Sequence, residues 1–333
     1  MVESKTIRPG LWLAALGLVA GAALSAGAQN LTYAKGQNVS PAYEGWEEDS
    51  AGRKFFVFGY MNRNWQEELD VPVGPDNRFT AGSADQGQPT HFLPRRNRFI
   101  FRVPVPAGFT EKDELVWSLT TRGKTEQAFA SLRLDYKIDD VVKASETGAL
   151  GAGSSSPEVR ANTPPVLEVQ GPRRIEVKVG EAVPLVVQLT DDGLPKARAI
   201  GAGAAVENAG SSATLSSNAA QVSKQIEALR ARRLMLPPQR VTVGKIVGLH
   251  VGWHVYRGAG SVKFDRAQIE AWEDTRTGGN SPWAPHWVAP PLPPDGKVTT
   301  TAWFYTPGEY VLRSRADDGA LTADQQVIVV VKP

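Results

Sequence analysis

The sequence predicts a mainly β protein made of two antiparallel β-sandwich domains, and three observations support this prediction. Short stretches along the whole chain alternate between apolar and polar residues, which is the side-chain period of a strand. Glycine and proline account for 32 and 24 of the 333 residues, which is typical of a protein with many turns. Two acidic turns, Asp191-Asp192-Gly193 and Asp317-Asp318-Gly319, each follow such an alternating stretch directly.

The N-terminus predicts a secretory signal peptide. Lys5 and Arg8 precede an apolar run over Leu11–Leu24, and small residues up to Ala28 follow it, so we expect a signal peptide over residues 1–28. The alternative is an uncleaved anchor, but the run is shorter than the roughly 20 residues that a spanning helix needs. We therefore expect an exported protein, periplasmic or extracellular, with no stable membrane insertion after cleavage.

Composition excludes several classes of function. The net charge is only +2, with 22% charged residues, so bulk electrostatics give no reason to expect nucleic acid or an anionic membrane as a partner. The chain has no cysteine, which excludes disulfides, thiolate metal sites and cysteine nucleophiles. The length is sufficient for two domains with substantial cores.

The first domain is expected over residues 30–143. Its basic strand shows the alternation well, because Arg96, Arg98 and Arg102 fall on one side while Phe99, Phe101 and Val103 fall on the other. Proline at 104 ends this strand, since proline cannot donate to a β-ladder. The strand-like stretches of this domain are residues 54–60, 96–103, 114–120 and 131–138.

A second domain is expected over residues 164–333, after a flexible linker over 144–163 that is rich in small and polar residues. Its sequence contains PPVLEV, VKVGEAVPLVVQLTDDGLP and TPGEYVLRSRADDGALTADQQVIVVV. In these motifs it resembles the immunoglobulin-like domains of the PKD and cadherin-like type in bacterial surface proteins. The resemblance implies an immunoglobulin-like sandwich and says almost nothing about function, while the N-terminal half resembles no family that we identify.

An insertion over about residues 196–242 interrupts this resemblance. Within it, residues 218–234 place apolar side chains at helical spacing, and Pro237 stops the run, so we expect one short helix. The helix is interpreted either as a lid packed on the sandwich or as a docking element for a partner.

The acidic turns are candidates for a calcium site. In an immunoglobulin-like sandwich, the loops after the second and sixth strands lie at the same pole, which would bring the two turns together. Clustered carboxylates suit Ca²⁺, whereas the alternative is simple turn chemistry, in which Asp bonds its own backbone and Gly takes a positive φ. The four candidate ligands are Asp191, Asp192, Asp317 and Asp318.

Histidine is scarce, and one pair shares a strand. His250 and His254 are four residues apart and therefore on one strand face, where two imidazoles could hold Zn²⁺ or Cu²⁺. No third ligand shows the appropriate spacing, so we expect a strand pair without a metal.

Aromatic and basic residues are candidates for ligand contacts. Exposed tryptophans stack on sugar rings or prolines, and the alternative is that they pin a proline-rich loop to the sandwich. Arg96 and Arg98 belong to a basic patch, residues 94–98, that would suit an anionic glycan or else be a solvated strand face. The tryptophans in question are Trp272, Trp283, Trp287 and Trp303.

Together these features predict a secreted, non-catalytic binding or structural protein that recognises a polysaccharide or a protein partner through its loops, with Ca²⁺ as a possible cofactor. The alternative is an extracellular hydrolase, or a hydrolase accessory, in which acids such as Glu67, Glu68 and Asp70 act on polysaccharide. That chemistry requires two carboxyl groups roughly 5 to 9.5 Å apart in a cleft.

Overall fold

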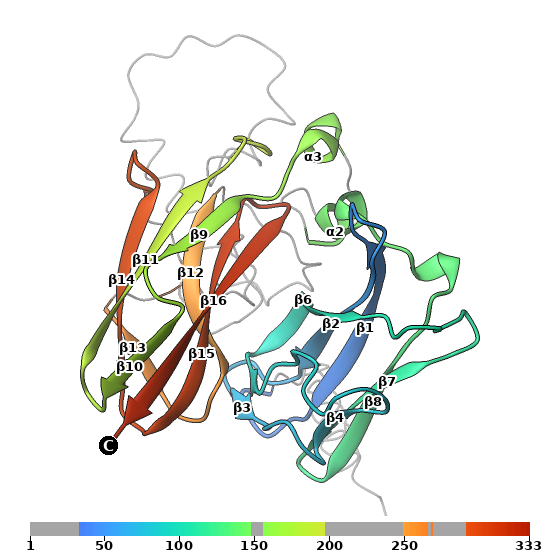
Figure 1. Ribbon diagram of the computed structural model, residues 1–333, viewed down its shortest axis with the longest axis horizontal. Coiled ribbons are helices and arrows are strands. Elements are labelled where there is room, and N and C mark those ends of the chain that lie inside the picture. The colour runs from blue at the N-terminus through green and yellow to red at the C-terminus, as the bar shows by residue number, and fades with distance from the viewer. Residues whose placement is uncertain (1–32, 148–155, 197–248, 266–267, 269–290) are drawn as a thin grey trace, which may run out of the picture. The chain divides into compact units, whose positions relative to one another are not determined.

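The computed structural model describes residues 33–147, 156–196, 249–265, 268 and 291–333. Residues Ala34–Pro333 belong to one compact unit, which is mainly β as predicted (Figure 1). It contains two β-sandwiches with separate hydrophobic cores. None of the helices in these ranges is long and apolar enough to cross a membrane.

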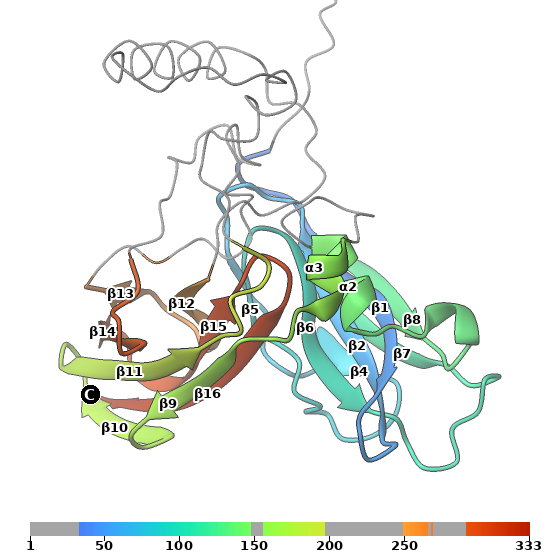
Figure 2. The ribbon, with the colours of Figure 1, turned by 90° about the horizontal axis from the view of Figure 1, so that it is seen from above.

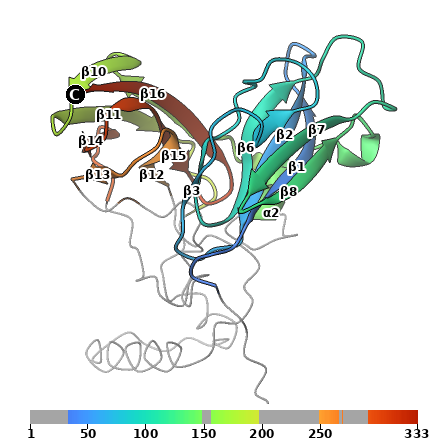
Figure 3. The same cartoon turned by 90° about the horizontal axis from the view of Figure 1, so that it is seen from below.

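The N-terminal sandwich consists of two three-stranded sheets, ordered β1-β2-β6 and β4-β7-β8, and a small β3-β5 ladder. Strands β1 and β8 of the two sheets lie side by side (Figure 3). Aromatic side chains fill the core, with Phe58 stacked on Phe101 and both in edge contact with Trp117. The bounds are β1 Val39–Glu48, β2 Lys54–Asn62, β3 Leu69–Asp70, β4 Asn77–Phe79, β5 His91–Phe92, β6 Arg95–Pro104, β7 Leu115–Thr121 and β8 Lys124–Ala130.

The basic strand β6 is interrupted by a bulge that the alternation did not predict. Phe58 pairs with Phe101, but Tyr60 already pairs with Asn97, so the intervening residues of β6 bulge out of the ladder. Phe99 lies in this bulge with φ 52° and is only half-buried, which corrects its predicted place beside the buried Phe101. Gly59 faces the bulge, and a Cβ there would lie 2.3 Å from the Asn97 carbonyl oxygen.

The C-terminal sandwich consists of two four-stranded sheets, ordered β10-β16-β15-β12 and β13-β14-β11-β9. All pairs are antiparallel except β10 with β16. The inward positions of each strand are apolar, as the sequence alternation predicted. The bounds are β9 Val166–Gln170, β10 Arg174–Lys178, β11 Ala182–Thr190, β12 His250–Arg257, β13 Val262–Phe264, β14 Lys297–Phe304, β15 Gly308–Asp317 and β16 Thr322–Lys332.

This strand order is that of the immunoglobulin fold. In the usual lettering of that fold, the sheet β9-β11-β14-β13 has the order A-B-E-D. The strands β12-β15-β16 of the other sheet have the order C-F-G, and β10 is added beside β16. Trp253 on the third strand is buried, with 2% of its surface exposed. The Tyr310 hydroxyl, near the start of the sixth strand, donates to the Thr306 carbonyl oxygen at 2.9 Å, which forms the tyrosine corner of such sandwiches. The C-terminal half is therefore immunoglobulin-like.

Two short helices lie near the segment that joins the sandwiches. Helix α2, Asp140–Thr147, and helix α3, Pro157–Ala161, lie side by side (Figure 2). A 3-10 turn, η1 at Leu134–Tyr136, precedes them. The Ser156 hydroxyl caps α3 by accepting from the Val159 N–H at 3.1 Å. The helices pack on the turn between β15 and β16 through four buried apolar residues: Ala144, Val159, Ala320 and Leu321.

Several predicted features lie outside the described residues. These are the signal peptide over 1–28, the insertion helix over 218–234, and three of the candidate tryptophans, Trp272, Trp283 and Trp287. The insertion falls between β11 and β12 of the immunoglobulin-like sandwich.

Candidate functional site

The outer face of strand β12 brings the two sandwiches together. Because side chains alternate along a strand, Trp253 and Val255 point into the immunoglobulin-like core, while His254 and Tyr256 point to the opposite face. That outer face is covered by the N-terminal sandwich, and Tyr256 belongs to the N-terminal hydrophobic core. The junction is therefore formed by strand positions that face away from their own core.

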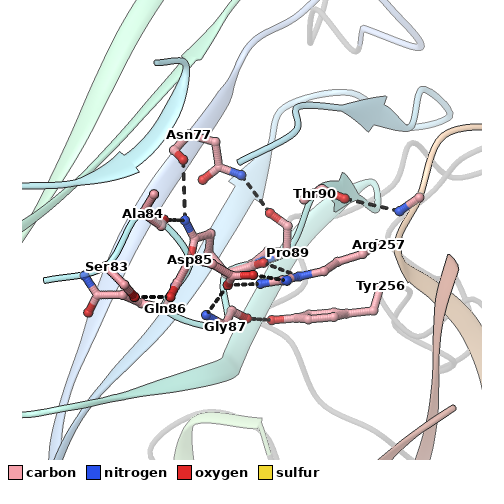
Figure 4. Close-up of polar contacts among 12 residues, drawn as sticks. Asn77, Ser83, Ala84, Asp85, Gln86, Gly87, Pro89, Thr90, Tyr256 and Arg257 are labelled. Carbon is pink, nitrogen blue, oxygen red and sulfur yellow. Dashed lines mark hydrogen bonds and ion pairs between the residues drawn. The ribbon is translucent and has the colours of Figure 1, made fainter. Parts of the chain in front are cut away.

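The loop before β5 binds the end of β12 through charge-assisted and backbone hydrogen bonds (Figure 4). The Arg257 guanidinium donates twice to the Asp85 carboxylate, at 2.7 Å each, and its Nε donates to the Gln88 carbonyl oxygen at 2.8 Å. The Thr90 N–H donates to the Tyr256 carbonyl oxygen at 3.3 Å. The hydrogen bond from Arg257 lowers the pKa of Asp85 to about 2, which keeps this ion pair charged over the physiological range.

Two arginines of β15 lie at the junction, where Arg313 is buried and Arg315 has 12% of its side chain exposed. Arg315 forms a bidentate pair with Asp324 of β16, with both N–O distances at 2.7 Å. Arg313 lies over the Tyr256 ring, 3.5 Å from its centroid, and its Nη1 donates to the Ile100 carbonyl oxygen of β6 at 2.6 Å. Burial alone would raise the pKa of Asp324, but the charges of Arg315 and Arg313 lower it to about 2. The buried charges are thus compensated, as burial requires.

Two histidines at the junction, His254 and His91, differ in charge at neutral pH. Burial, with the nearby positive charges of Arg315 and Arg313, lowers the pKa of His254 to about 3, so this ring is neutral. Burial would also lower the pKa of His91, but hydrogen bonds to Asp70 and Glu68 outweigh it and raise that pKa to about 9. His91 is therefore a buried cation at neutral pH.

Both sandwiches line a small pocket at this point. The N-terminal sandwich contributes the Tyr60, His91 and Asn97 side chains, and the immunoglobulin-like sandwich contributes His254 and Arg315. Polar groups that line such a space can hold an ordered water.

The acids of the hydrolase alternative are engaged by basic partners. Glu67 pairs with Arg122 and accepts from the Gly36 N–H at 2.6 Å. Glu68 and Asp70 bind the two ring nitrogens of His91, Nε2 at 2.8 Å and Nδ1 at 2.7 Å. An imidazole therefore separates these two carboxylates, and the arrangement stabilises a protonated histidine.

The acidic turns meet at one pole through the segment that joins the sandwiches. Asp192 accepts from the Thr163 N–H at 2.9 Å and from its hydroxyl at 2.7 Å. Asp318, in the other turn, accepts from the Asn162 amide at 3.0 Å. Because Asn162 and Thr163 are adjacent, the turns after β11 and β15 lie at the same end of the sandwich, as their sequence positions predicted.

The calcium site at this pole stays a prediction. Asp191 and Asp317 each accept from the backbone N–H two residues later, which is the turn chemistry of the alternative interpretation. Asp191 Oδ1 and Asn162 Oδ1 are buried and accept no hydrogen bond from the described part of the chain. Within that part, no group of three or more histidine or acidic side chains is arranged to hold a metal ion.

The candidate ligand-binding arginines have intramolecular partners. Arg96 pairs with Glu44 at 2.8 Å, and Arg98 pairs with Glu146 of α2 at 2.8 Å. Burial raises the pKa of Glu44 although both arginines oppose it. Trp303, on β14, is half-buried, and its cross-strand neighbours are Ala182 and Lys263. The structure brings Arg96 and Arg98 together but places neither beside Trp303 in the sheets.

Sequence reasoning missed the junction residues. Arg313, Arg315 and Asp324 occupy outward positions of their strands, which is also where solvated charges occur. The available signal was the density of charge on two neighbouring strands and a tyrosine at position 256 on the outer face of β12. Neither observation indicates what covers that face.

Comparisons with known proteins add little to this description. No protein-family profile and no curated protein sequence matches the chain. Among solved structures, the S-layer protein rSbsC(31-844) aligns at 9% identity and a TM-score of 0.21, over 89% of this chain and 28% of that chain. A chimeric titin Z1Z2 aligns at 9% identity and a TM-score of 0.21, over 90% of this chain and 100% of that chain. The fibronectin(III)-like modules of Clostridium thermocellum CbhA align at 8% identity and a TM-score of 0.21, over 89% of this chain and 94% of that chain.

Superpositions of this quality support no conclusion about function. The immunoglobulin-like assignment rests instead on strand order, on the buried Trp253 and on the Tyr310 corner.

Proposed function

We propose that this is an exported, non-catalytic protein that binds a polysaccharide or a protein partner, or is a structural part of a surface assembly. Its two sandwiches act as one scaffold that presents loops at fixed positions. The domain boundaries belong to this proposal: a signal peptide over 1–28, domains over 30–143 and 164–333, and a linker over 144–163.

The junction is the observation that most favours a scaffold. Charged side chains from the two sandwiches are used for mutual contact, as in the bidentate Arg257–Asp85 pair and the Arg313 contact with Ile100. Bidentate arginine pairs fix orientation as well as contributing energy. A fixed orientation between two sandwiches suits recognition of an extended ligand, because separate loops then meet it without a further cost in chain entropy.

Finer parts of the proposal concern family and ligand contacts. The C-terminal sandwich is proposed to be of the PKD or cadherin-like type, with Ca²⁺ at Asp191, Asp192, Asp317 and Asp318. Trp272, Trp283, Trp287 and Trp303 are proposed as aromatic contacts for the partner, since indole faces suit sugar rings and prolines.

The test is a binding and cleavage assay with the mature protein. Soluble and insoluble polysaccharides, and an extracellular protein extract, are each incubated with the protein, and both retention and product release are measured. We expect retention by at least one polysaccharide or defined protein with no new reducing ends. Reducing-sugar release that survives purification would establish the hydrolase alternative and overturn the proposal.

A further inference from the structure

Arg95 is held in an unusual backbone conformation at the start of β6. Its φ is 62°, in the left-handed region that favours glycine, and its N–H donates to the Asn64 carbonyl oxygen at 3.3 Å. An arginine at this position is strained, whereas glycine would not be. Strained non-glycine residues cluster at binding sites, where the side chain is needed for a reason other than folding.

The Arg95 guanidinium stacks on an aromatic ring. Its central carbon lies 3.9 Å from the centroid of the Trp65 ring. Its Nη1 donates to the Arg63 carbonyl oxygen at 3.1 Å, and both Arg95 and Trp65 are half-buried while Arg63 is exposed. A guanidinium that stacks through its face keeps its in-plane N–H groups available for a bidentate acceptor.

Arg95 differs from its neighbours in lacking a counter-ion. Three other arginines of β6 have carboxylate partners: Arg96 with Glu44, Arg98 with Glu146 and Arg102 with Glu47. Across the residues that the structure describes, Arg95 forms no ion pair. Its pKa is lowered, and the cause is burial of the guanidinium. A partly desolvated cation without an anion is unfavourable, so an external anion would be stabilised there.

We propose that Arg95, stacked on Trp65 and beside Arg63, binds an oxyanion group of an acidic polysaccharide. The guanidinium would donate two parallel hydrogen bonds to a carboxylate or a sulfate of the polysaccharide. This inference rests on the proposed function, because it names the ligand class and one contact of the same binding protein.

The experiment compares binding of three polymers to the full mature protein: polygalacturonate, dextran sulfate and neutral dextran. The main variant is Arg95→Gly, because glycine accepts the backbone conformation and removes the side chain without strain. The matched control is Arg102→Ala, since Arg102 also stacks on an aromatic ring, Phe55 at 4.9 Å, but is paired with Glu47. Arg95→Lys keeps the charge and loses the bidentate geometry.

We expect one of the two acidic polymers to bind, and the one that binds identifies the oxyanion. Arg95→Gly should weaken that binding about tenfold or more, and Arg95→Lys should weaken it nearly as much, as loss of a charge-assisted bidentate contact implies. Arg102→Ala should stay within about twofold of wild type, as expected for an exposed charge outside the contact.

Three results would overturn the inference. These are no binding of either acidic polymer, equal losses in Arg95→Gly and Arg102→Ala, and binding of vesicles containing phosphatidylserine in place of both polymers. Retention of a neutral polysaccharide or a protein by Arg95→Gly would leave the proposed function in place while rejecting this site. Thermal unfolding of each variant confirms that it is folded.

Discussion

Replacing Asp318 with asparagine should stabilise the protein at neutral pH. Asp318 has 2% of its surface exposed, and burial raises its pKa from 3.8 to about 6. Its Oδ1 accepts from the Ala320 N–H at 2.6 Å and the Leu321 N–H at 2.8 Å, and an asparagine oxygen can accept both. The new amide can donate to Asn162 Oδ1, which accepts no hydrogen bond from the described residues, once the Asn162 amide rotates.

The sign and size of the effect follow from linkage. A carboxyl whose pKa is higher in the folded state favours folding when protonated, so its stabilising effect is complete below pH 3.8 and is lost as the pH rises through about 6. The difference between these two pKa values, at about 1.4 kcal/mol per unit, gives an upper limit of about 3 kcal/mol. The substitution also requires the Asn162 amide to rotate, which offsets part of this gain, so we expect about 1.5 kcal/mol.

Urea unfolding followed by tryptophan fluorescence, in EDTA and at several values between pH 4 and pH 8, measures the effect. Asp318→Asn should exceed wild type in unfolding free energy above pH 7, and the difference should nearly vanish at pH 4. Asp192→Asn is the matched control with the opposite sign: its hydrogen bond to Thr163 lowers the pKa of Asp192, so its stabilisation is present at neutral pH and lost on acidification. A less stable Asp318→Asn at pH 8, or a difference that does not depend on pH, would refute this reasoning.

Three further predictions concern the junction and the immunoglobulin-like sandwich. Arg257→Ala should lower the unfolding free energy by about 1 kcal/mol, because the Arg257–Asp85 pair is partly exposed; an unchanged thermal midpoint would contradict a stabilising junction. Tyr310→Phe should cost about 1 to 1.5 kcal/mol in denaturant unfolding through loss of the corner hydrogen bonds, and a neutral effect would argue against the tyrosine corner. Millimolar Ca²⁺ should raise the thermal midpoint of wild type but not of Asp192→Asn with Asp317→Asn; a wild type that does not respond to Ca²⁺ would discard the calcium prediction.

The sequence alone predicted the fold class well because side-chain alternation reports directly on strands. The alternation predicted the strands β11 and β16, the motif resemblance implied the immunoglobulin-like sandwich, and the acidic turns were correctly expected to meet at one pole. The bulge at Phe99 escaped prediction, since period-2 alternation assumes an unbroken ladder and two extra residues on one strand leave no sign in hydrophobicity.

The junction could not be predicted for a different physical reason. Alternation separates the face that packs on a strand's own core from the opposite face, but it does not say whether water or another sandwich covers the second face. Arg313 and Arg315 therefore match a solvated strand face in sequence, although Arg313 is buried and the Arg315 side chain is mostly covered. Likewise, the basic patch predicted Arg96 and Arg98 as ligand contacts, which stays a prediction, but it did not predict their ion pairs with Glu44 and Glu146, which are distant in sequence.

The central claim is that the junction holds two sandwiches in one fixed arrangement, and a distance measurement between spin labels tests it most directly. The chain has no cysteine, so Lys112→Cys and Glu168→Cys, both at exposed positions on different sandwiches, would provide unique label sites. We predict one narrow distance distribution, which broadens when Arg257 and Arg313 are both replaced by alanine. A broad or multiple distribution in the protein with an intact junction would contradict the account.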